Sequence, residues 1–180
     1  MTTLRIYPED NSDKTLMVTE DGQTIGSELA AVGVRFERWS ATADIEGASD
    51  EAILSAYQPE IDRLINEAGY QSYDVVHMVP DHPQRVALRE KFLSEHTHGE
   101  DEVRFFVAGQ GLFNLHIGQR VYSVLCCRND LISVPANTPH WFDMGPAPRF
   151  TAIRLFNNPE GWVAQFTGSD IADRFPLLDV

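Results

Sequence analysis

The stretch Glu95-His-Thr-His-Gly-Glu-Asp-Glu-Val-Arg104 decides the fold, because its backbone conformation determines which polar side chains meet. In a helix, His98 and Glu102 would share a face, but His96 would point roughly 200° away from His98. In an extended chain, residues of equal parity lie on one side, so all three would face the same way. The β-forming run Val103-Arg-Phe-Phe-Val107 follows at once and favours the extended form. The sequence therefore predicts His96, His98 and Glu102 as metal ligands.

A fourth candidate ligand follows in the segment Pro135-Ala-Asn-Thr-Pro-His140, where a turn would place His140 at the start of a new strand. Three imidazoles and one carboxylate suit divalent iron, nickel, manganese or zinc. On a six-coordinate metal, four protein ligands leave two adjacent positions for a chelating substrate. That arrangement is typical of a reactive site rather than of a closed structural one.

The chain after residue 94 has a β character. Short strand-like runs are separated by turn residues such as Gly109-Gln-Gly111, and they occupy residues 103–108, 112–117, 120–127, 131–134, 140–144, 150–156 and 162–167. Short strands spaced by turns in this way indicate a sandwich or a small barrel.

Before residue 94, helical periodicity is mixed with short strands. Helices are predicted over 24–31, over 50–68 with an interruption at Pro59, and over 80–92, with a strand over 74–79. The length of 180 residues fits one domain. We expect a mixed α/β part over 1–93 that packs on a metal-binding β-barrel core over 94–170, followed by a tail over 171–180.

The charge of the chain restricts its partners. With 27 acidic and 14 basic residues, the net charge is −13, which disfavours nucleic acid and anionic membranes. A small anionic substrate remains compatible if arginines line a local pocket. Cys126 and Cys127 are adjacent and unsuited to bonding each other, which fits a reducing compartment. With no signal pattern at the amino terminus and no apolar run of roughly 20 residues, we expect a cytoplasmic protein. We expect a monomer.

The ligand segments resemble the two cupin motifs. The first motif has the pattern His-x-His, three or four residues, Glu, six residues, Gly, which His96, His98, Glu102 and Gly109 reproduce. The second motif is filled by Asn129-Asp130, Pro135, Asn137 and His140, with asparagine at both positions where the motif has glycine. Asparagine also tolerates positive φ, so we expect both turns to be retained.

Within the cupins, the chain resembles the acireductone dioxygenase family along most of its length. The matching segments begin Gly33-Val-Arg-Phe-Glu-Arg-Trp39, Ala87-Leu-Arg-Glu-Lys-Phe92, Glu95-His-Thr-His, Ile132-Ser-Val-Pro and Asn158-Pro-Glu-Gly-Trp162. This resemblance implies a mainly β fold with some α, in which a cupin (double-stranded β-helix, or jelly-roll) barrel is flanked by N-terminal helices and short strands.

The resemblance also implies an activity, that of a metal-dependent dioxygenase of methionine salvage. Its substrate would be 1,2-dihydroxy-3-keto-5-methylthiopentene, bound as a dianion through two oxygens. With one Fe(II) per chain, O2 would cleave it to 4-methylthio-2-oxobutanoate and formate. With Ni(II), the products would be methylthiopropionate, formate and carbon monoxide.

Five further residues are candidates for the substrate site. Arg104 has the parity of Glu102 and should point inward, where an unpaired guanidinium is costly. We expect it to stabilise the negative charge of the substrate, although a salt bridge to a carboxylate is the alternative. Arg154 fits a functional role and a structural ion pair equally well. Phe142 shares the parity of His140, and the family resemblance adds Phe105 and Trp162 as possible pocket walls, although aromatics in a barrel commonly form core.

Other functions remain open on the sequence. A different cupin dioxygenase could carry the same four ligands, and a non-catalytic metal-binding cupin or a zinc hydrolase would also fit them. The remaining histidines, His77, His82 and His116, are expected to be structural. Glu95, Glu100 and Asp101 lie near the ligands in sequence, and any of them could serve as the base that deprotonates the enediol.

Overall fold

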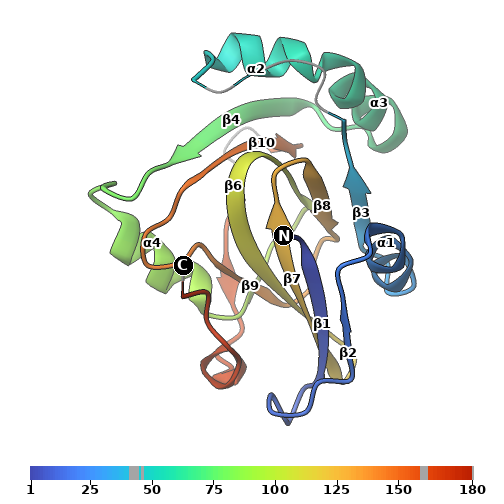
Figure 1. Ribbon diagram of the computed structural model, residues 1–180, viewed down its shortest axis with the longest axis vertical. Coiled ribbons are helices and arrows are strands. Elements are labelled where there is room, and N and C mark those ends of the chain that lie inside the picture. Colours follow the sequence, from blue (N-terminus) through green and yellow to red (C-terminus); the bar gives the residue numbers. More distant parts are fainter. Residues whose placement is uncertain (41–44, 46, 159–161, 180) are drawn as a thin grey trace.

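The computed structural model describes residues 1–40, 45, 47–158 and 162–179, and it shows a β-barrel with helices on its outside (Figure 1). The elements, in chain order, are β1 (Thr3–Pro8), β2 (Met17–Thr19), α1 (Gly22–Ala30), β3 (Arg35–Arg38), α2 (Asp50–Ala56), α3 (Gln58–Ala68), β4 (Ser72–Met78), α4 (Arg85–Leu93), β5 (His96–Thr97), β6 (Glu102–Ile117), β7 (Arg120–Cys127), β8 (Asp130–Val134), β9 (His140–Asp143), β10 (Phe150–Phe156), β11 (Gln165–Phe166) and a 3-10 turn at Ile171–Arg174.

The strands form two antiparallel sheets that share β6. One sheet has the order β11-β5-β9-β6-β7-β1-β2, and the other has the order β4-β10-β6-β8-β3. The first half of β6 pairs with β8 and β10, while its second half pairs with β7 and β9. This continuous strand therefore carries the chain from one wall of the barrel to the other.

The prediction of two strands separated by a turn at residues 109–111 is wrong. Pairing with β10 is shifted by one residue where Phe106 faces Ala152 and Ala108 faces Thr151, which marks a β-bulge inside one strand. Gly109 and Gly111 do not form a turn. Their lack of a side chain lets neighbouring groups lie directly against the β6 backbone. A Cβ on Gly109 would lie 1.9 Å from the carbonyl oxygen of Arg149, and one on Gly111 would lie 2.4 Å from the Phe142 ring.

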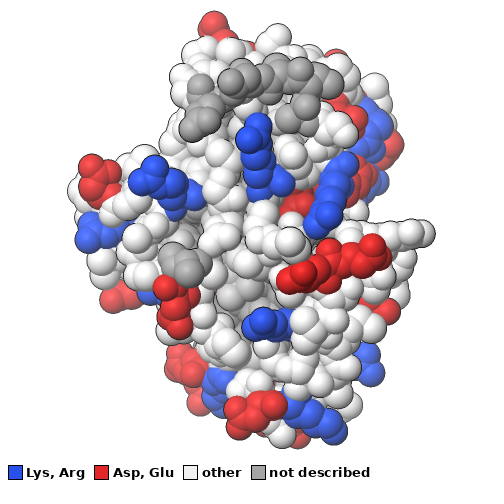
Figure 2. Space-filling model, viewed as in Figure 1, with Lys and Arg blue, Asp and Glu red and all other residues white. Residues whose placement is uncertain are grey.

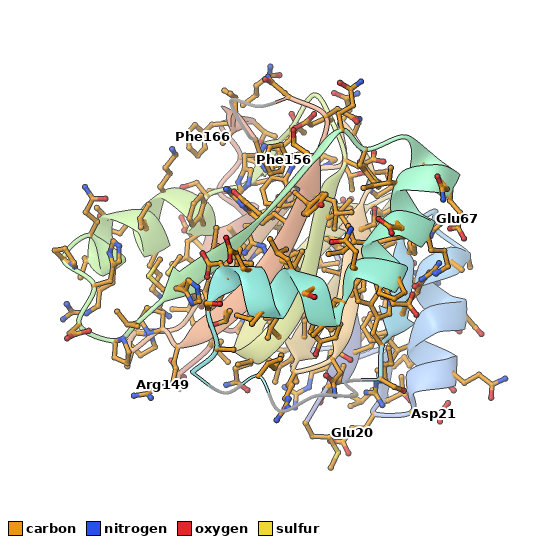
Figure 3. All side chains as sticks on the ribbon, turned by 90° about the horizontal axis from the view of Figure 1, so that it is seen from above. Glu20, Asp21, Glu67, Arg149, Phe156 and Phe166 are labelled. Atoms are coloured by element: carbon orange, nitrogen blue, oxygen red, sulfur yellow. The ribbon has the colours of Figure 1, made fainter. Side chains whose placement is uncertain are left out.

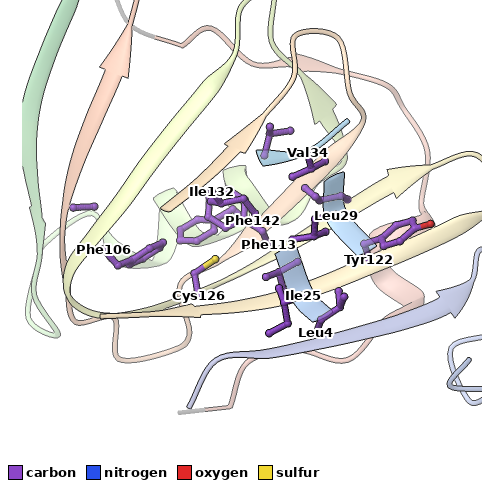
Figure 4. Packing of buried hydrophobic residues seen from close by; sticks show 14 of the residues in the cluster. Leu4, Ile25, Leu29, Val34, Phe106, Phe113, Tyr122, Cys126, Ile132 and Phe142 are labelled. Atoms are coloured by element: carbon purple, nitrogen blue, oxygen red, sulfur yellow. The ribbon is translucent and has the colours of Figure 1, made fainter. Parts of the chain in front are cut away.

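The bulge changes which residues of β6 face the barrel interior. Before it, Phe106 faces inward, and after it Phe113 and Leu115 do so. Figure 4 shows the rings of Phe106, Phe113 and Phe142 close together inside the barrel, with Phe113 and Phe142 4.8 Å apart between ring centroids. Ile25 and Leu29 of α1 join this core, so α1 covers part of the interior.

A second core lies on the outer face of the β4-β10-β6-β8-β3 sheet. Ile53, Ile61 and Leu64 of α2 and α3 pack there against Phe105 and Leu131, and Figure 1 shows both helices outside β4. The predicted interruption at Pro59 is confirmed, because α2 ends at Ala56 and Pro59 lies in the first turn of α3. The helix predicted over 80–92 is shorter than expected, since α4 begins only at Arg85.

The N-terminal part, residues 1–93, contributes strands to the barrel as well as packing on it. Its strands extend both sheets, with β1 paired to β7, β3 to β8 and β4 to β10. The predicted tail is also packed, since Ile171, Ala172 and Phe175 are buried against Trp141 and Tyr7. Residues 94 and 171 therefore mark changes in composition and not structural boundaries.

The surface carries both signs of charge. On the face drawn in Figure 2, acidic and basic side chains are interspersed, and neither sign forms a continuous field. Within the described part of the chain, no helix has the length and apolarity needed to span a bilayer.

Candidate metal centre

Three strands bring the four predicted ligands together. β5 supplies His96 and the turn after it supplies His98, while Glu102 and His140 are the first residues of β6 and β9. His96 and His140 are direct partners in the β5–β9 pair. One possible ligand atom from each side chain lies within 4.8 Å of the others, and all four residues are buried. The predicted ligand set is thus one compact cluster.

The turn that delivers His140 has the conformation expected from its asparagine. Asn137 has φ +61°, and its backbone N–H donates to the carbonyl oxygen of His98 at 2.8 Å. Asn129, the other asparagine of the second motif, has φ +75°. The two cupin motifs are therefore joined directly by a backbone hydrogen bond, and asparagine meets the positive φ that glycine would otherwise supply.

The backbone orients each imidazole. Nδ1 lies near a carbonyl oxygen in all three rings: 2.7 Å from Ser94 for His96, 3.0 Å from Val163 for His98, and 2.8 Å from Thr138 for His140. An Nδ1–H that donates to a carbonyl leaves the Nε2 lone pair free to bind a metal. Nε2 of His98 and of His140 lie 2.9 and 3.0 Å from Oε2 of Glu102. Lone pairs gathered around a carboxylate are a donor set that suits a divalent cation.

Two members of the cluster, His96 and Glu102, have the charge states of metal ligands. Burial would lower the pKa of His98, but contacts with Glu102 and the Val163 carbonyl outweigh burial and raise that pKa. Burial, reinforced by the neighbouring His140, lowers the pKa of His96 to about 4, so that imidazole is neutral at neutral pH. Burial would raise the pKa of Glu102, but the adjacent His140 and His98 and the nearby Arg104 outweigh it and hold the pKa well below its usual value. A neutral imidazole and an ionised carboxylate are the forms that bind metals.

Arg104 lies beside the cluster and is buried, as its parity predicts. Its Nη2 donates to Oε1 of Glu102 at 3.1 Å, so the salt bridge considered as an alternative is present. The guanidinium carbon lies 4.6 Å from the ring centroid of Phe142 and 5.5 Å from that of Trp162. Nε is buried and has no partner among the described residues. Burial lowers the pKa of this guanidinium.

A pocket opens onto the metal ligands. It is lined by Lys91, Phe92, His96, His98, Glu102, Arg104, Phe142, Arg154, Trp162 and Ala164. Arg154 lines the pocket and forms an ion pair with Asp74 at 2.5 and 2.8 Å, so the structural ion pair considered for it is present. Phe166 and Phe156 flank this end of the molecule, and Arg149 lies at the opposite end (Figure 3).

Phe105 does not lie in this pocket. It is fully buried in the outer core, where it stacks on Trp39 with 4.3 Å between ring centroids and also contacts Tyr57. The physical reason is strand parity, since Glu102 and Arg104 face the interior and Phe105 therefore faces the other side. The candidate role of Phe105 in substrate binding is corrected to core packing.

Lys91, Phe92 and Ala164 line the pocket although the sequence did not single them out. A signal was available for the first two, because the predicted helix ends only a few residues before His96. Its last turn must therefore lie near the ligands. Ala164 follows Trp162 by two residues and carries no chemical signal of its own.

The three acidic candidates for a base are all engaged by other groups. Glu95 accepts a hydrogen bond from Thr167 and lies 2.7 Å from His116. Asp101 accepts hydrogen bonds from the Tyr70 hydroxyl and the Ala136 N–H, while Glu100 accepts from the backbone N–H of Asn157 and Asn158. None of the three lines the pocket described above.

The fold and the site together define the class of the protein. A double-sheet barrel that brings three histidines and one glutamate together beside a pocket is a cupin-type metal site. Comparison with known proteins narrows the class, since the model of the ARD/ARD' family matches residues 3–164. The chain belongs to the acireductone dioxygenase family and is an oxidoreductase.

Individual relatives agree with this assignment. The chain is 59% identical over 179 residues to an acireductone dioxygenase of Yersinia pseudotuberculosis serotype O:3 (strain YPIII), with 99% of each chain covered. It is 62% identical over 180 residues to that of Pseudomonas paraeruginosa, again with 99% of each covered. Among solved structures, it matches an acireductone dioxygenase from Bacillus anthracis with a cadmium ion in its active centre, with a TM-score of 0.78 and 30% identity over 92% of this chain and 98% of the other.

Proposed function

We propose that the chain cleaves the acireductone 1,2-dihydroxy-3-keto-5-methylthiopentene with O2 in methionine salvage. With Fe(II), the products are 4-methylthio-2-oxobutanoate and formate, and with Ni(II) they are methylthiopropionate, formate and carbon monoxide. The observation that carries this proposal is the buried cluster of three histidines and one glutamate, of which His96, His98 and Glu102 line a pocket that two arginines also line.

The proposal assigns the metal to His96, His98, Glu102 and His140, with one ion per chain. The imidazoles would bind it through Nε2, because their Nδ1 atoms are directed to backbone carbonyls. When bound, Fe(II) or Ni(II) supplies positive charge for an anionic substrate and a template that fixes which substrate oxygens are held.

Arg104 is the catalytic residue of the proposal. Its guanidinium is held next to the ligand cluster by Glu102, and its position in the pocket suits it to stabilise negative charge on the substrate. Because the group is buried, its interaction with that charge is stronger than it would be in water. Arg154 offers a second cation at the same pocket, oriented by Asp74.

The aromatic wall of the pocket suits the less polar part of the substrate. Phe142 and Trp162 line the pocket with their rings near the Arg104 guanidinium, and Phe92 adds a further ring. We assign these side chains to the methylthio tail, whose sulfur packs favourably against aromatic rings. Their bulk also limits the access of water.

Anaerobic reconstitution of the apo-protein with Fe(II) or Ni(II) tests the function. The acireductone absorbance is then followed after O2 is added, and the products are identified. The keto acid and formate with iron, and carbon monoxide with nickel, are the expected outcome. If both ions bind at the four ligands but neither supports turnover, the acireductone assignment is wrong and a non-catalytic cupin becomes the better description.

We also propose that the protein works as a cytoplasmic monomer whose partners are the acireductone and O2. Two adjacent free thiols, Cys126 and Cys127, support a reducing compartment. Sedimentation at micromolar concentration tests the oligomeric state, and a dimer mass would contradict it.

A further inference from the structure

Among the described residues, Lys91 is the one cation of the pocket wall for which no ion pair is found. It lies in the last turn of α4, and its side chain is exposed while also lining the pocket. The other two cations of the wall are both engaged, Arg104 by Glu102 and Arg154 by Asp74. Among the described residues, no carboxylate forms a salt bridge with Lys91. Its positive charge is therefore available to a ligand that enters from solvent.

The positive charge of Lys91 adds to a group of cations in the pocket wall, although the chain as a whole is acidic. The chain has a net charge of −13, so an anion approaching the molecule from a distance meets net repulsion. The pocket wall holds three cations and one carboxylate, Glu102. Glu95, a buried carboxylate four residues after Lys91, already contacts His116 and accepts a hydrogen bond from Thr167. The pocket is therefore a local positive region on an acidic protein.

We propose that Lys91 attracts the doubly charged substrate to the mouth of the pocket and so determines the preference for a dianion. This inference rests on the proposed function, because it takes the acireductone as the ligand. Attraction by an exposed lysine acts before the chemical step. It raises the rate and affinity of substrate capture, which appear in kcat/KM, and it leaves kcat unchanged. Lys91 is thus a specificity residue and not a catalytic one.

A purely structural role for Lys91 makes a different prediction. A cation in the last turn of a helix interacts favourably with the helix dipole. If that were its whole contribution, removing the charge would lower the stability of α4 slightly and leave the kinetics unchanged. Ionic strength separates the two roles further, since attraction between an exposed charge and a ligand is screened by salt.

The test compares three variants of the metal-loaded enzyme: Lys91→Met, Lys91→Glu and Arg149→Glu. Arg149 is an exposed cation at the opposite end of the molecule from Phe166 (Figure 3), so its reversal changes the net charge as Lys91→Glu does. Steady-state kinetics with the acireductone are measured from about 20 to about 300 mM salt, a range over which screening changes strongly.

We expect kcat/KM at low salt to fall about threefold to tenfold in Lys91→Met and about tenfold or more in Lys91→Glu. In both variants kcat should stay within about twofold of the wild type, and the differences should shrink at high salt. Arg149→Glu should behave like the wild type. Equal effects of Lys91→Glu and Arg149→Glu would overturn the inference, as would a salt-independent fall in kcat for either Lys91 variant. Wild-type enzyme without turnover would instead refute the proposed function.

Discussion

At the scale of single residues, the site depends on a few side chains with strict geometric requirements. Glu102 is the most connected of them, because its two oxygens meet His98, His140 and Arg104. It is also nearly inaccessible to water, with 4% of its surface exposed. A neutral side chain here would remove the negative charge that both a divalent cation and Arg104 require.

Glu102→Gln should therefore lose metal. We expect affinity for Fe(II) or Ni(II) to fall at least about tenfold to a hundredfold, since loss of an outer partner of a ligand already costs that much. Metal content after dialysis and turnover are the measurements. Glu90→Gln, an exposed change on α4, is the control and should retain both. Full metal content in Glu102→Gln would contradict the assignment of this carboxylate as a ligand.

Single residues also show what the sequence could predict at the site. The four ligands were predictable because three of them lie in one short segment whose parity follows from strand geometry. The family resemblance suggested Phe105 as a pocket residue. Strand parity predicts instead that it faces away from Glu102 and Arg104, and the structure agrees with parity. Lys91 and Phe92 could not be assigned from parity, because their position depends on how α4 packs against β9, which is a long-range contact.

At the scale of elements, β6 sets the geometry of the barrel. Its bulge and its two glycines let one strand serve both sheets, and Gly111 also allows the Phe142 ring to lie directly against the backbone. The sequence placed the glycines correctly but assigned them to a turn. Glycine is common both in turns and in β-bulges, so residue type does not distinguish the two. The distinction depends on the strands that pair with this segment, and those strands are distant in the sequence.

Gly111→Ala should disturb both the strand and the pocket wall. Its Cβ would lie 2.4 Å from the Phe142 ring, so the ring must move. We expect the free energy of unfolding to fall by about 1–3 kcal/mol, as for overpacked cores, and KM for the acireductone to rise. Urea unfolding and steady-state kinetics test this. Gly26→Ala in α1 is the control, because its Cβ meets only an ordinary contact at 3.7 Å.

Helix α3 is attached to β3 through a charged contact that depends on pH. Arg63 donates to Glu37 at 2.5 Å, and the indole N–H of Trp39 donates to the same carboxylate at 2.9 Å. Burial raises the pKa of Glu37, but these hydrogen bonds outweigh it, so the pKa lies below the usual 4.5. A lowered carboxyl pKa in the folded state stabilises the protein above the unfolded pKa, and this stabilisation is lost as the pH falls.

Glu37→Gln should therefore be less stable than the wild type at neutral pH, by about 1 kcal/mol for a partly exposed pair. The difference should shrink as the pH is lowered through and below 4.5, where the wild-type carboxyl takes up a proton. Urea unfolding at several pH values measures it, with exposed Glu20→Gln as the reference. A difference that is constant with pH would show that the charge of Glu37 does not contribute.

At the scale of the whole molecule, a buried carboxylate joins three distant parts of the chain. Asp143, at the end of β9, accepts two hydrogen bonds from Arg89 of α4 and one from the backbone N–H of Leu178. Arg89 in turn donates to the carbonyl oxygen of Leu178. Through this contact the C-terminal residues and the helix that carries Lys91 and Phe92 are fixed to the strand that begins with His140.

Arg89→Met should leave Asp143 buried without its cation. We expect a loss of about 2–4 kcal/mol in unfolding free energy, slightly less than for a fully buried pair because Arg89 is partly exposed. Thermal unfolding measures this, and limited proteolysis should show earlier cleavage near the C-terminus. Arg85→Met, on the same helix and without a salt bridge among the described residues, is the matched control. Equal stabilities of the two variants would rule out the proposed role of the contact.

The carbonyl oxygens that orient the three imidazoles also bear on how the enzyme acquires its metal. Since Ser94, Thr138 and Val163 already fix the rings, an incoming ion has little ordering of the protein left to impose. We therefore expect an ion to enter or leave the folded barrel without unfolding it. If the proposed function holds, the supply of ions at the moment of loading would decide between iron and nickel in this barrel.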